Sequence, residues 1–322
     1  MPDPLPKFNQ SIIPINSTII VGLSGGPDSI YLLHQLKSVE QQLNIKIIAA
    51  HLDHEWQESS KIAVAVCQQA CLQLSTPLII KKFSELEFDV KWNGSQEEIG
   101  RKMRRHVFES VARERQASAI ALAHHQQDQQ ETFFIRLIRG SSLKGLTGIQ
   151  ATDSLYIRPI LQSKKQEIID YLHFHNIAYY TDPTNTSDQY LRNRIRNLVI
   201  PTLQSIDDRF EQNLNATMDH LTKVQDFLEH HTLQVLSKIK TDQGVDIQSF
   251  LLVHEVVQQR ILLLMLIEQK IIFTPSQKLF KEIMRFLEKS SKNKHIIYES
   301  CCVQKNKSYF TMKKIEKSYK NL

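Results

Sequence analysis

The first half of the chain alternates short β-rich runs with longer amphipathic stretches, and this alternation constrains the fold more than any other feature. Runs rich in β-branched residues predict four strands, at 18–23, 45–51, 77–83 and 118–124. Between and after them, helical periodicity predicts helices at 29–43, 59–74, 96–116 and 128–139. Parallel strands need crossover connections of this length. The pattern therefore predicts an α/β fold with a parallel sheet covered by helices on both faces.

Beyond about residue 206 the pattern changes to long helical stretches without a convincing strand. They span residues 210–240, 247–270 and 276–289, and a β-prone stretch at 295–312 follows. A chain of 322 residues suits about two domains. We therefore predict a sheet domain over 1–205, a smaller all-helical domain over 206–290 and a basic β-prone tail over 291–322.

Charge and cysteine content narrow the possible classes of protein. The net charge is +6. From Lys281 onward the sequence contains eleven Lys and Arg but only four Asp and Glu, so the excess of basic residues lies at this end. This excess suits either a solvated surface or a contact with phosphate groups. The four cysteines form no Cys-x-x-Cys unit, which argues against a zinc ribbon or an iron–sulfur cluster. With no signal-like N-terminus and no long apolar run, we expect a cytoplasmic protein.

The clearest ligand-binding motif is the turn after the first strand, Ser24-Gly25-Gly26-Pro27-Asp28-Ser29. Two glycines let the backbone approach an anion, and the N–H groups of the following helix N-terminus point at it. An ordinary strand-to-helix turn is the alternative. The motif lacks the lysine that reaches a γ-phosphate in GxxxxGK[ST] loops. We therefore predict a loop that holds pyrophosphate as a leaving group, with Asp28 binding Mg²⁺.

Polar segments also follow the second and fourth strands, at the edge where parallel sheets bind their ligands. The second strand ends in HLDH, which contains His51 and Asp53, and the fourth leads into HHQQDQQET, which contains His125 and Asp128. The two histidines of HLDH suit a metal site or merely a polar strand end. The carboxylates in HHQQDQQET also suit the first turn of a helix. Position after a strand favours a functional role for both segments.

Two groups of arginines lie on predicted helices. Arg101 and Arg104 share a face with Glu97, and Arg192 and Arg196 share one in the motif YLRNRIR, all at i,i+3 or i,i+4 spacing. Each group is either a solvated helix face or a guanidinium cluster for phosphate or carboxylate groups.

Together these segments resemble the tRNA(Ile)-lysidine synthetase family of PP-loop ATP pyrophosphatases, also called adenine nucleotide alpha hydrolases. The matching motifs stand in the family's order over residues 18 to about 203: SGGPDS, HLDH, ExxxRxxR, HHxxDQxET, RLIRGSSxxGL, RPIL, DPTN and YLRNRIR. The resemblance implies a PP-loop, Rossmann-like N-terminal domain and an enzyme that uses ATP and Mg²⁺. It also implies the substrates, L-lysine and a tRNA(Ile) with a CAU anticodon. ATP would adenylate O2 of the wobble cytidine, and the lysine amine would then displace AMP to give lysidine.

The resemblance carries roles over to individual residues. The nucleotide would contact Ser24, Gly25, Gly26, Pro27, Asp28, Ser29, His51 and Asp53. Catalysis would involve Asp28, Asp128, Arg101, Arg104, Glu97 and His125, with Mg²⁺ on Asp28 and Asp128. The tRNA would contact Arg139, Arg192, Arg194 and Arg196, besides the helical domain and the basic tail.

Some residues depart from the family pattern, and other functions stay open. Gln127 stands where the family commonly has the first of two aspartates, and Arg105 stands where a tyrosine is frequent. A PP-loop tRNA thiolase would need the missing Cys-x-x-Cys ligands. A tRNA-binding module with an inactive loop is the non-enzyme alternative, against which the intact SGGPDS motif argues. A homodimer and an organelle such as a plastid also remain open.

Overall fold

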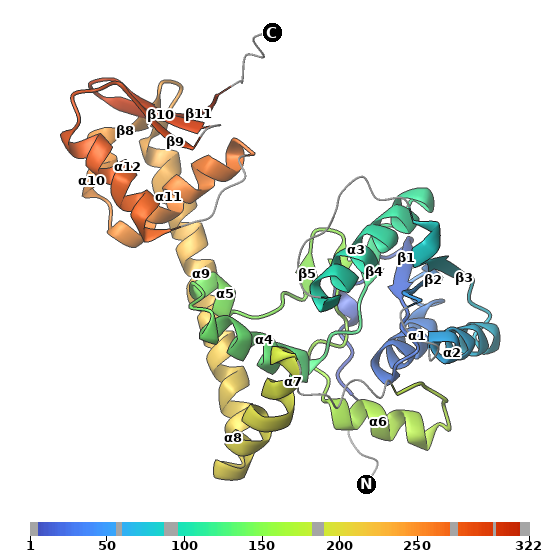
Figure 1. Cartoon of the computed structure of the whole chain (residues 1–322). Coiled ribbons are helices and arrows are strands. Elements are labelled where there is room, and N and C mark those ends of the chain that lie inside the picture. Colours follow the sequence, from blue (N-terminus) through green and yellow to red (C-terminus); the bar gives the residue numbers. More distant parts are fainter. Residues whose placement is uncertain are drawn as a thin grey trace. The chain divides into compact units, whose positions relative to one another are not determined.

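Figure 1 shows the computed structural model of the chain, which describes residues 6–55, 60–86, 96–181, 190–270, 276–298 and 301–315. The chain divides into two compact units, Met1–Asp219 and His220–Leu322. The DPTN motif at 182–185 lies outside the described residues. Of the helices that the structure describes, none has both the length and the hydropathy of a membrane-spanning segment.

The first unit is built on a six-stranded sheet with the order β3-β2-β1-β4-β6-β5. Its strands are β1 (Thr18–Gly22), β2 (Lys46–Asp53), β3 (Leu78–Lys82), β4 (Ala119–Ala121), β5 (Thr152–Asp153) and β6 (Tyr156–Ile157). All neighbouring pairs are parallel except the short β5–β6 pair. The predicted parallel α/β fold is thereby confirmed. The strand order turns back between β1 and β4, so the chain leaves these two neighbours in opposite directions, which is where such sheets bind ligands.

Helices cover both faces of this sheet (Figure 1). The covering helices are α1 (Pro27–Val39), α2 (Ser60–Gln73), α3 (Gln96–Glu114) and α6 (Lys165–Phe174). The unit also contains α4 (Gln126–Ile138), α5 (Leu143–Leu146) and the 3-10 turns η1 (Gln10–Ile12) and η2 (Phe83–Glu85), and α4 packs against α5 and α7 (Leu191–Arg194). Successive β1 residues face opposite sides. Ile19 and Val21 join a core with α1, α2 and α6, whereas Ile20 joins a second core with α3. Both faces of the sheet are therefore apolar and buried.

The sheet unit ends in a short helical segment that is less regular than predicted. It comprises α7 (Leu191–Arg194), a π turn, η4 (Ile195–Val199), and α8 (Ile200–Ile206), and α9 (Phe210–Ile239) follows. The sequence predicts one helix over 190–203. Pro201 has no N–H to give to the carbonyl four residues earlier, so the regular ladder is interrupted and the π turn precedes it.

The second unit packs helices against an antiparallel sheet with the order β7-β8-β11-β10-β9. Its elements after α9 are β7 (Lys240–Thr241), β8 (Gly244–Asp246), α10 (Ile247–Leu252), α11 (Glu255–Glu268), α12 (Gln277–Lys289), β9 (Lys294–Tyr298), β10 (Cys301–Lys305) and β11 (Tyr309–Lys314). The expected all-helical region thus also contains the β7–β8 hairpin, whose strands are too short to show an alternating pattern. The predicted β-prone stretch forms β9, β10 and β11.

Strands β10 and β11 of the predicted basic tail are part of the second unit's core. Val303, Phe310 and Met312 are buried there with Ile283 of α12 and Phe250 of α10. Apolar residues of β11 alternate with polar ones, so one face of the strand is buried while Lys313 and Lys314 are exposed. Residues 301–314 are therefore a structural component as well as a source of positive charge.

Candidate active site

The turn that closes β1 is shaped by Gly25. Its φ of +82° lies in the left-handed region, and a Cβ there would come 2.9 Å from the Ala63 carbonyl oxygen and 3.4 Å from Cys67 Sγ. Glycine is therefore needed both for the backbone conformation and for the close packing against α2. After this turn, Gly26 caps α1 and Pro27 begins it, so the helix starts directly under the loop.

The two serines of the loop have different surroundings. Ser29 is buried, and its hydroxyl donates to the Gly26 carbonyl (2.9 Å) and accepts from the Ser24 N–H (3.1 Å). Ser24 is exposed, and its Oγ lies 3.1 Å from Ser29 Oγ. The Ser29 hydroxyl thus holds the loop in shape, whereas the Ser24 hydroxyl faces solvent and is available to a ligand.

Two neighbouring elements brace the loop. His51, at the end of β2, places Nδ1 2.8 Å from the Leu23 carbonyl oxygen, and this side chain is only 5% exposed. Burial lowers the pKa of His51, so the imidazole is neutral and Nδ1–H donates to the carbonyl. The Tyr180 N–H donates to the Gly25 carbonyl (2.9 Å). His51, predicted to contact the nucleotide, therefore holds the backbone at Leu23, the residue directly before the loop.

Asp28 and Asp128 meet at one imidazole. His125 is 4% exposed, and its Nε2 lies 3.6 Å from an oxygen of each carboxylate. His125 Nδ1 accepts the Gln127 N–H (3.2 Å), which leaves Nε2 as the ring nitrogen that faces the two carboxylates. The structure thus brings Asp28, His125 and Asp128 together, and their catalytic and metal-binding roles stay predictions.

Asp128 is held as an anion. Burial raises the pKa of this carboxyl, but His125, His124, Arg192 and the His125 N–H together outweigh burial, and the pKa is lowered. The His125 N–H donates to Asp128 Oδ2 at 2.9 Å, within the capping box that starts α4. His124 remains neutral, because burial lowers its pKa to about 4. The site therefore presents the negative charge of Asp128 beside the buried imidazole of His124.

Asp28 has a partner that the sequence does not indicate. Lys165, the first residue of α6, places Nζ 2.6 Å from Asp28 Oδ1 and 2.7 Å from Oδ2. The two residues are 137 positions apart in the chain, and α6 packs beside α1 (Figure 1). An ammonium group thus lies at the mouth of the loop, although the loop itself lacks a lysine.

Glu131 is the centre of a buried ion pair that the sequence also does not indicate. Its side chain is fully buried. Arg196 Nε donates to Glu131 Oε1 at 2.6 Å, and Arg192 Nε forms an ion pair with Oε2 at 3.1 Å. Burial raises the pKa of Glu131, while the hydrogen bond from Arg196 acts in the opposite direction. Arg192 also reaches Thr132 Oγ1 (3.3 Å). Arg192 and Arg196, predicted to contact tRNA, therefore join α7 and η4 to α4.

The arginines of α3 border the same edge of the sheet. Arg101 and Arg104 are exposed, and the charge of Arg104 helps to lower the pKa of His54, which burial brings to about 4. Burial and the charge of Arg101 lower the pKa of Arg136 on α4. Glu97 lies in α3, and its side chain falls outside the described residues. Asp53, at the end of β2, accepts the Glu55 N–H (2.9 Å).

The glycine-rich loop after α4 is fixed by two side chains of that helix. Arg136 donates to the carbonyls of Gly145 (2.6 Å) and Gly148 (2.7 Å). Gln129 pairs with both backbone groups of Ile149, at 2.6 Å and 2.7 Å. Arg139, predicted to contact tRNA, is exposed at the start of this loop, and Arg194 is exposed on α7.

Asp28 and Asp128 fit a magnesium ion that arrives with a nucleotide. Magnesium in such sites takes one or two carboxylates and completes its shell with phosphate oxygens and water. Within the part of the chain that the structure describes, no group of three or more His, Cys, Asp or Glu side chains could hold a metal ion by itself. Two carboxylates are a donor set that such a substrate-borne ion uses.

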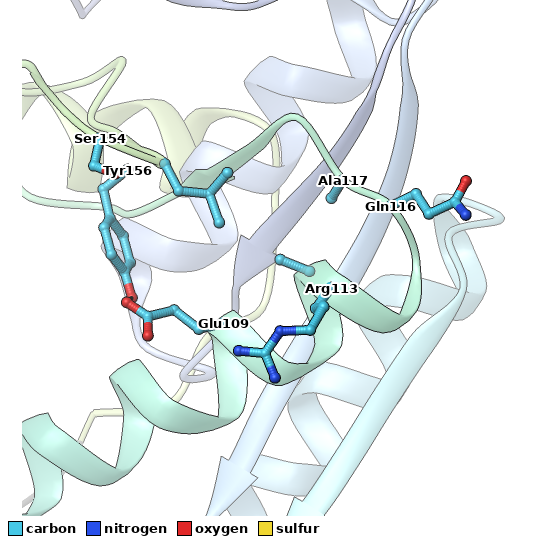
Figure 2. Close-up of a pocket in the computed structure, with 8 residues that line it drawn as sticks. Glu109, Arg113, Gln116, Ala117, Ser154 and Tyr156 are labelled. Carbon is cyan, nitrogen blue, oxygen red and sulfur yellow. The ribbon is translucent and has the colours of Figure 1, made fainter.

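A separate hollow of about 340 Å³ lies between the end of α3 and the β5–β6 hairpin (Figure 2). Ala117 and Ser154 line it, just before β4 and β6 begin, so it opens at the amino edge of the sheet. Figure 2 shows the Glu109 carboxylate directed at the Tyr156 hydroxyl, at a distance of 3.0 Å. The loop after β1 lies at the opposite, carboxyl edge, so this hollow is not part of the nucleotide site.

Comparison with known proteins agrees with this geometry. The PP-loop domain family matches residues 6–203. A tRNA(Ile)-lysidine synthase of Clostridium perfringens is 32% identical over 84% of the chain and 57% of its own length. The enzyme of the same name from Chlorobaculum tepidum is 31% identical over 70% of the chain and 69% of its own length. The chain thus spans little more than half of the first of these relatives.

A solved structure shares the fold. The U34-tRNA thiolase NcsA from Methanococcus maripaludis, solved with its [4Fe-4S] cluster, superimposes with a TM-score of 0.57 at 17% identity. The match covers 67% of this chain and 76% of the thiolase. At this identity the likeness concerns the fold alone.

Proposed function

Because the chain belongs to the PP-loop domain family and, within it, to the tRNA(Ile)-lysidine synthases, we propose that it joins lysine to a tRNA at the expense of ATP. The acceptor is C2 of the wobble cytidine in the CAU anticodon of tRNA(Ile). The products are lysidine, AMP and pyrophosphate. This modification changes the tRNA from methionine and AUG to isoleucine and AUA identity.

One observation carries the proposal. The SGGPDS turn lies directly before α1, and Asp28 on this helix meets Asp128 of α4 at His125 Nε2, 3.6 Å from each carboxylate. An anion-binding loop thus lies beside two carboxylates at the carboxyl edge of a parallel sheet. This arrangement supports attack at the α-phosphate, with diphosphate as the leaving group.

In the first step, O2 of the cytidine attacks the α-phosphate, the bond to the β-phosphate oxygen breaks, and pyrophosphate leaves. The exposed Ser24 hydroxyl and the N–H groups at the start of α1 bind the developing negative charge. These donors are already in place, because the Ser29 hydroxyl and the His51 imidazole hold the loop in shape. Asp28 and Asp128 would hold Mg²⁺, which neutralises charge on the departing diphosphate.

In the second step, the lysine ε-amine forms a bond to C2, the C2–O bond to AMP breaks, and the amine loses a proton. The Asp128 carboxylate is the group we assign to orient the amine and accept the proton. His125 accepts the Gln127 N–H at Nδ1 and faces both carboxylates with Nε2, so we assign it to position the two carboxylates. Arg101 and Arg104 are exposed beside the site and are assigned to the AMP phosphate or the lysine carboxylate.

The tRNA contacts are assigned to exposed cations of both units. Arg139 and Arg194 are exposed in the first unit. In the second, Lys307, Lys313 and Lys314 are exposed on and beside the β10–β11 hairpin. Phosphate contacts of this kind give an affinity that falls steeply with salt. The anticodon bases are single-stranded and can be turned into the site.

The test is lysine incorporation into two tRNAs that share the CAU anticodon. Purified protein is incubated with ATP, Mg²⁺, radiolabelled lysine and transcripts of either the isoleucine or the methionine tRNA. We expect label only in the isoleucine tRNA, and only with ATP. Label in neither tRNA would contradict the proposed activity, and equal label in both would contradict the assigned specificity.

A further inference from the structure

A partly buried ion pair between Lys165 and Asp28 lies at the mouth of the SGGPDS turn after β1. Lys165 Nζ contacts both oxygens of the Asp28 carboxylate, at 2.6 Å and 2.7 Å. The Lys165 side chain is 34% exposed and that of Asp28 is 25% exposed, so both are accessible to a ligand. No motif in the sequence predicts that these two residues form an ion pair.

The position of this pair is not explained by stability. Ion pairs with this exposure contribute little to the free energy of unfolding. Helix α6 is already anchored in the core, where Ile168 and Leu172 are fully buried. The pair also places a cation where the loop needs one, because the carboxylate of Asp28 would otherwise repel a diphosphate at the N-terminus of α1.

We propose that Lys165 is the phosphate-binding lysine of this site. The inference rests on the proposed use of ATP. When the nucleotide binds, the ammonium moves from Asp28 to oxygens of the β- and γ-phosphates, and the Asp28 oxygens become available to Mg²⁺. The Lys165 ammonium contacts both Asp28 oxygens, which are the atoms that Mg²⁺ would bind. The ammonium and Mg²⁺ therefore bind Asp28 one after the other, Lys165 before the nucleotide arrives and Mg²⁺ afterwards. The lysine missing from the loop is thus supplied by α6.

The chemistry of lysine suits this exchange. Its ammonium is a compact point charge on a flexible stem, so it can turn between two anions without moving the backbone. Lys164 is adjacent and exposed. Its backbone N–H donates to the Glu167 carboxylate (3.1 Å), and a substitution of the Lys164 side chain retains this hydrogen bond. Lys164 therefore offers a control with the same charge and nearly the same position in the chain.

The experiment measures binding of ATP, pyrophosphate and AMP, each with Mg²⁺, by calorimetry on the full chain. We compare Lys165→Gln, Lys165→Arg and the control Lys164→Gln. Loss of a charge-assisted hydrogen bond predicts that Lys165→Gln weakens ATP and pyrophosphate binding about ten-fold or more. AMP lacks the β- and γ-phosphates, so its affinity stays the same. Lys165→Arg restores part of the loss, and Lys164→Gln changes nothing.

A second measurement needs no variant and covers a Lys165→Gln protein that fails to fold. In the unchanged protein, pyrophosphate with Mg²⁺ should protect Lys165 from amine acetylation in mass spectrometry, whereas AMP should not, and Lys164 should react equally in all samples. Equal pyrophosphate binding by Lys165→Gln, equal loss for all three ligands, or no protection of Lys165 would overturn the proposal. Absence of ATP binding by the unchanged protein would instead contradict the proposed function itself.

Discussion

Substitution of Gly25 by alanine tests whether the shape of the loop after β1 depends on glycine for two separable reasons. The backbone of Gly25 has a φ of +82°, and its missing Cβ would lie 2.9 Å from the Ala63 carbonyl oxygen. Gly140 provides a matched control, because it has a φ of +69° and nothing within 4 Å of the added Cβ. Gly140→Ala therefore has the conformational cost without the steric one.

The expected magnitudes follow from these two terms. An L-residue in the left-handed region costs about 1–2 kcal/mol, which applies to both substitutions. Crowding of an added methyl against a backbone oxygen costs about 1–3 kcal/mol more, which applies to Gly25 alone. We expect Gly140→Ala to lower the free energy of unfolding by about 1–2 kcal/mol and Gly25→Ala by about 2–5 kcal/mol.

Urea unfolding followed by far-UV circular dichroism measures this difference. Pyrophosphate affinity is measured on the same proteins. We expect it to fall in Gly25→Ala, where the loop must shift away from Ala63, and to stay unchanged in Gly140→Ala.

The result that refutes this reasoning is equal stability of the two variants together with normal pyrophosphate binding by Gly25→Ala. The loop would then accept a side chain at Gly25 without moving, and its N–H groups would not be held by the packing against α2. Equal stability with lost binding would instead show that the methyl group blocks the ligand directly.

Three further predictions concern the surroundings of the loop. Glu131→Gln should lower the free energy of unfolding by about 2–3 kcal/mol, which is less than for a fully buried pair because both arginines are partly exposed. In the same urea titration, the exposed control Glu98→Gln should change the free energy of unfolding by less than about 1 kcal/mol. Equal effects of the two substitutions would contradict the ion-pair assignment. His54 and His124 have pKa values lowered to about 4 in the folded protein, so below pH 6.5 these histidines bind protons more readily in the unfolded chain than in the folded one. The free energy of unfolding should therefore fall as the pH drops from 6.5 towards 4. Urea midpoints that do not change between pH 7 and pH 5 would refute this. Arg139→Ala and Arg194→Ala should each weaken tRNA binding and reduce the salt dependence by about one phosphate contact, with ATP affinity unchanged; a filter-binding titration with an unaltered salt slope would argue against these contacts.

Much of the fold is visible in the sequence because its signals are local. Each of the four predicted strands is a short apolar run next to an amphipathic helix, and the SGGPDS turn is a contiguous motif at a strand end. The carboxyl-edge position of Asp28, His125 and Asp128 then follows from topology alone, and their meeting at His125 agrees with it. The short β7–β8 hairpin has too few residues to show a period, so it is missed.

The ion pairs of the site are not visible in the sequence, because they join residues far apart in the chain. Lys165 and Asp28 are 137 positions apart, and Arg196 and Glu131 are 65 apart. The spacing of Arg192 and Arg196 predicts correctly that they share a helix face, but spacing cannot reveal that a buried carboxylate of α4 faces them. Similarly, the position of His51 after a strand suggests ligand contact, whereas its burial directs Nδ1 to a backbone carbonyl.

The central claim is that the loop after β1 binds the diphosphate that leaves, so that the nucleobase receives AMP. The most direct measurement incubates the protein with ATP labelled at the α-phosphate, Mg²⁺ and the isoleucine tRNA, before lysine is added, and separates the products. The account predicts pyrophosphate release and label bound to the tRNA, which lysine then displaces as AMP. Formation of ADP and orthophosphate, with no label on the tRNA, would contradict it.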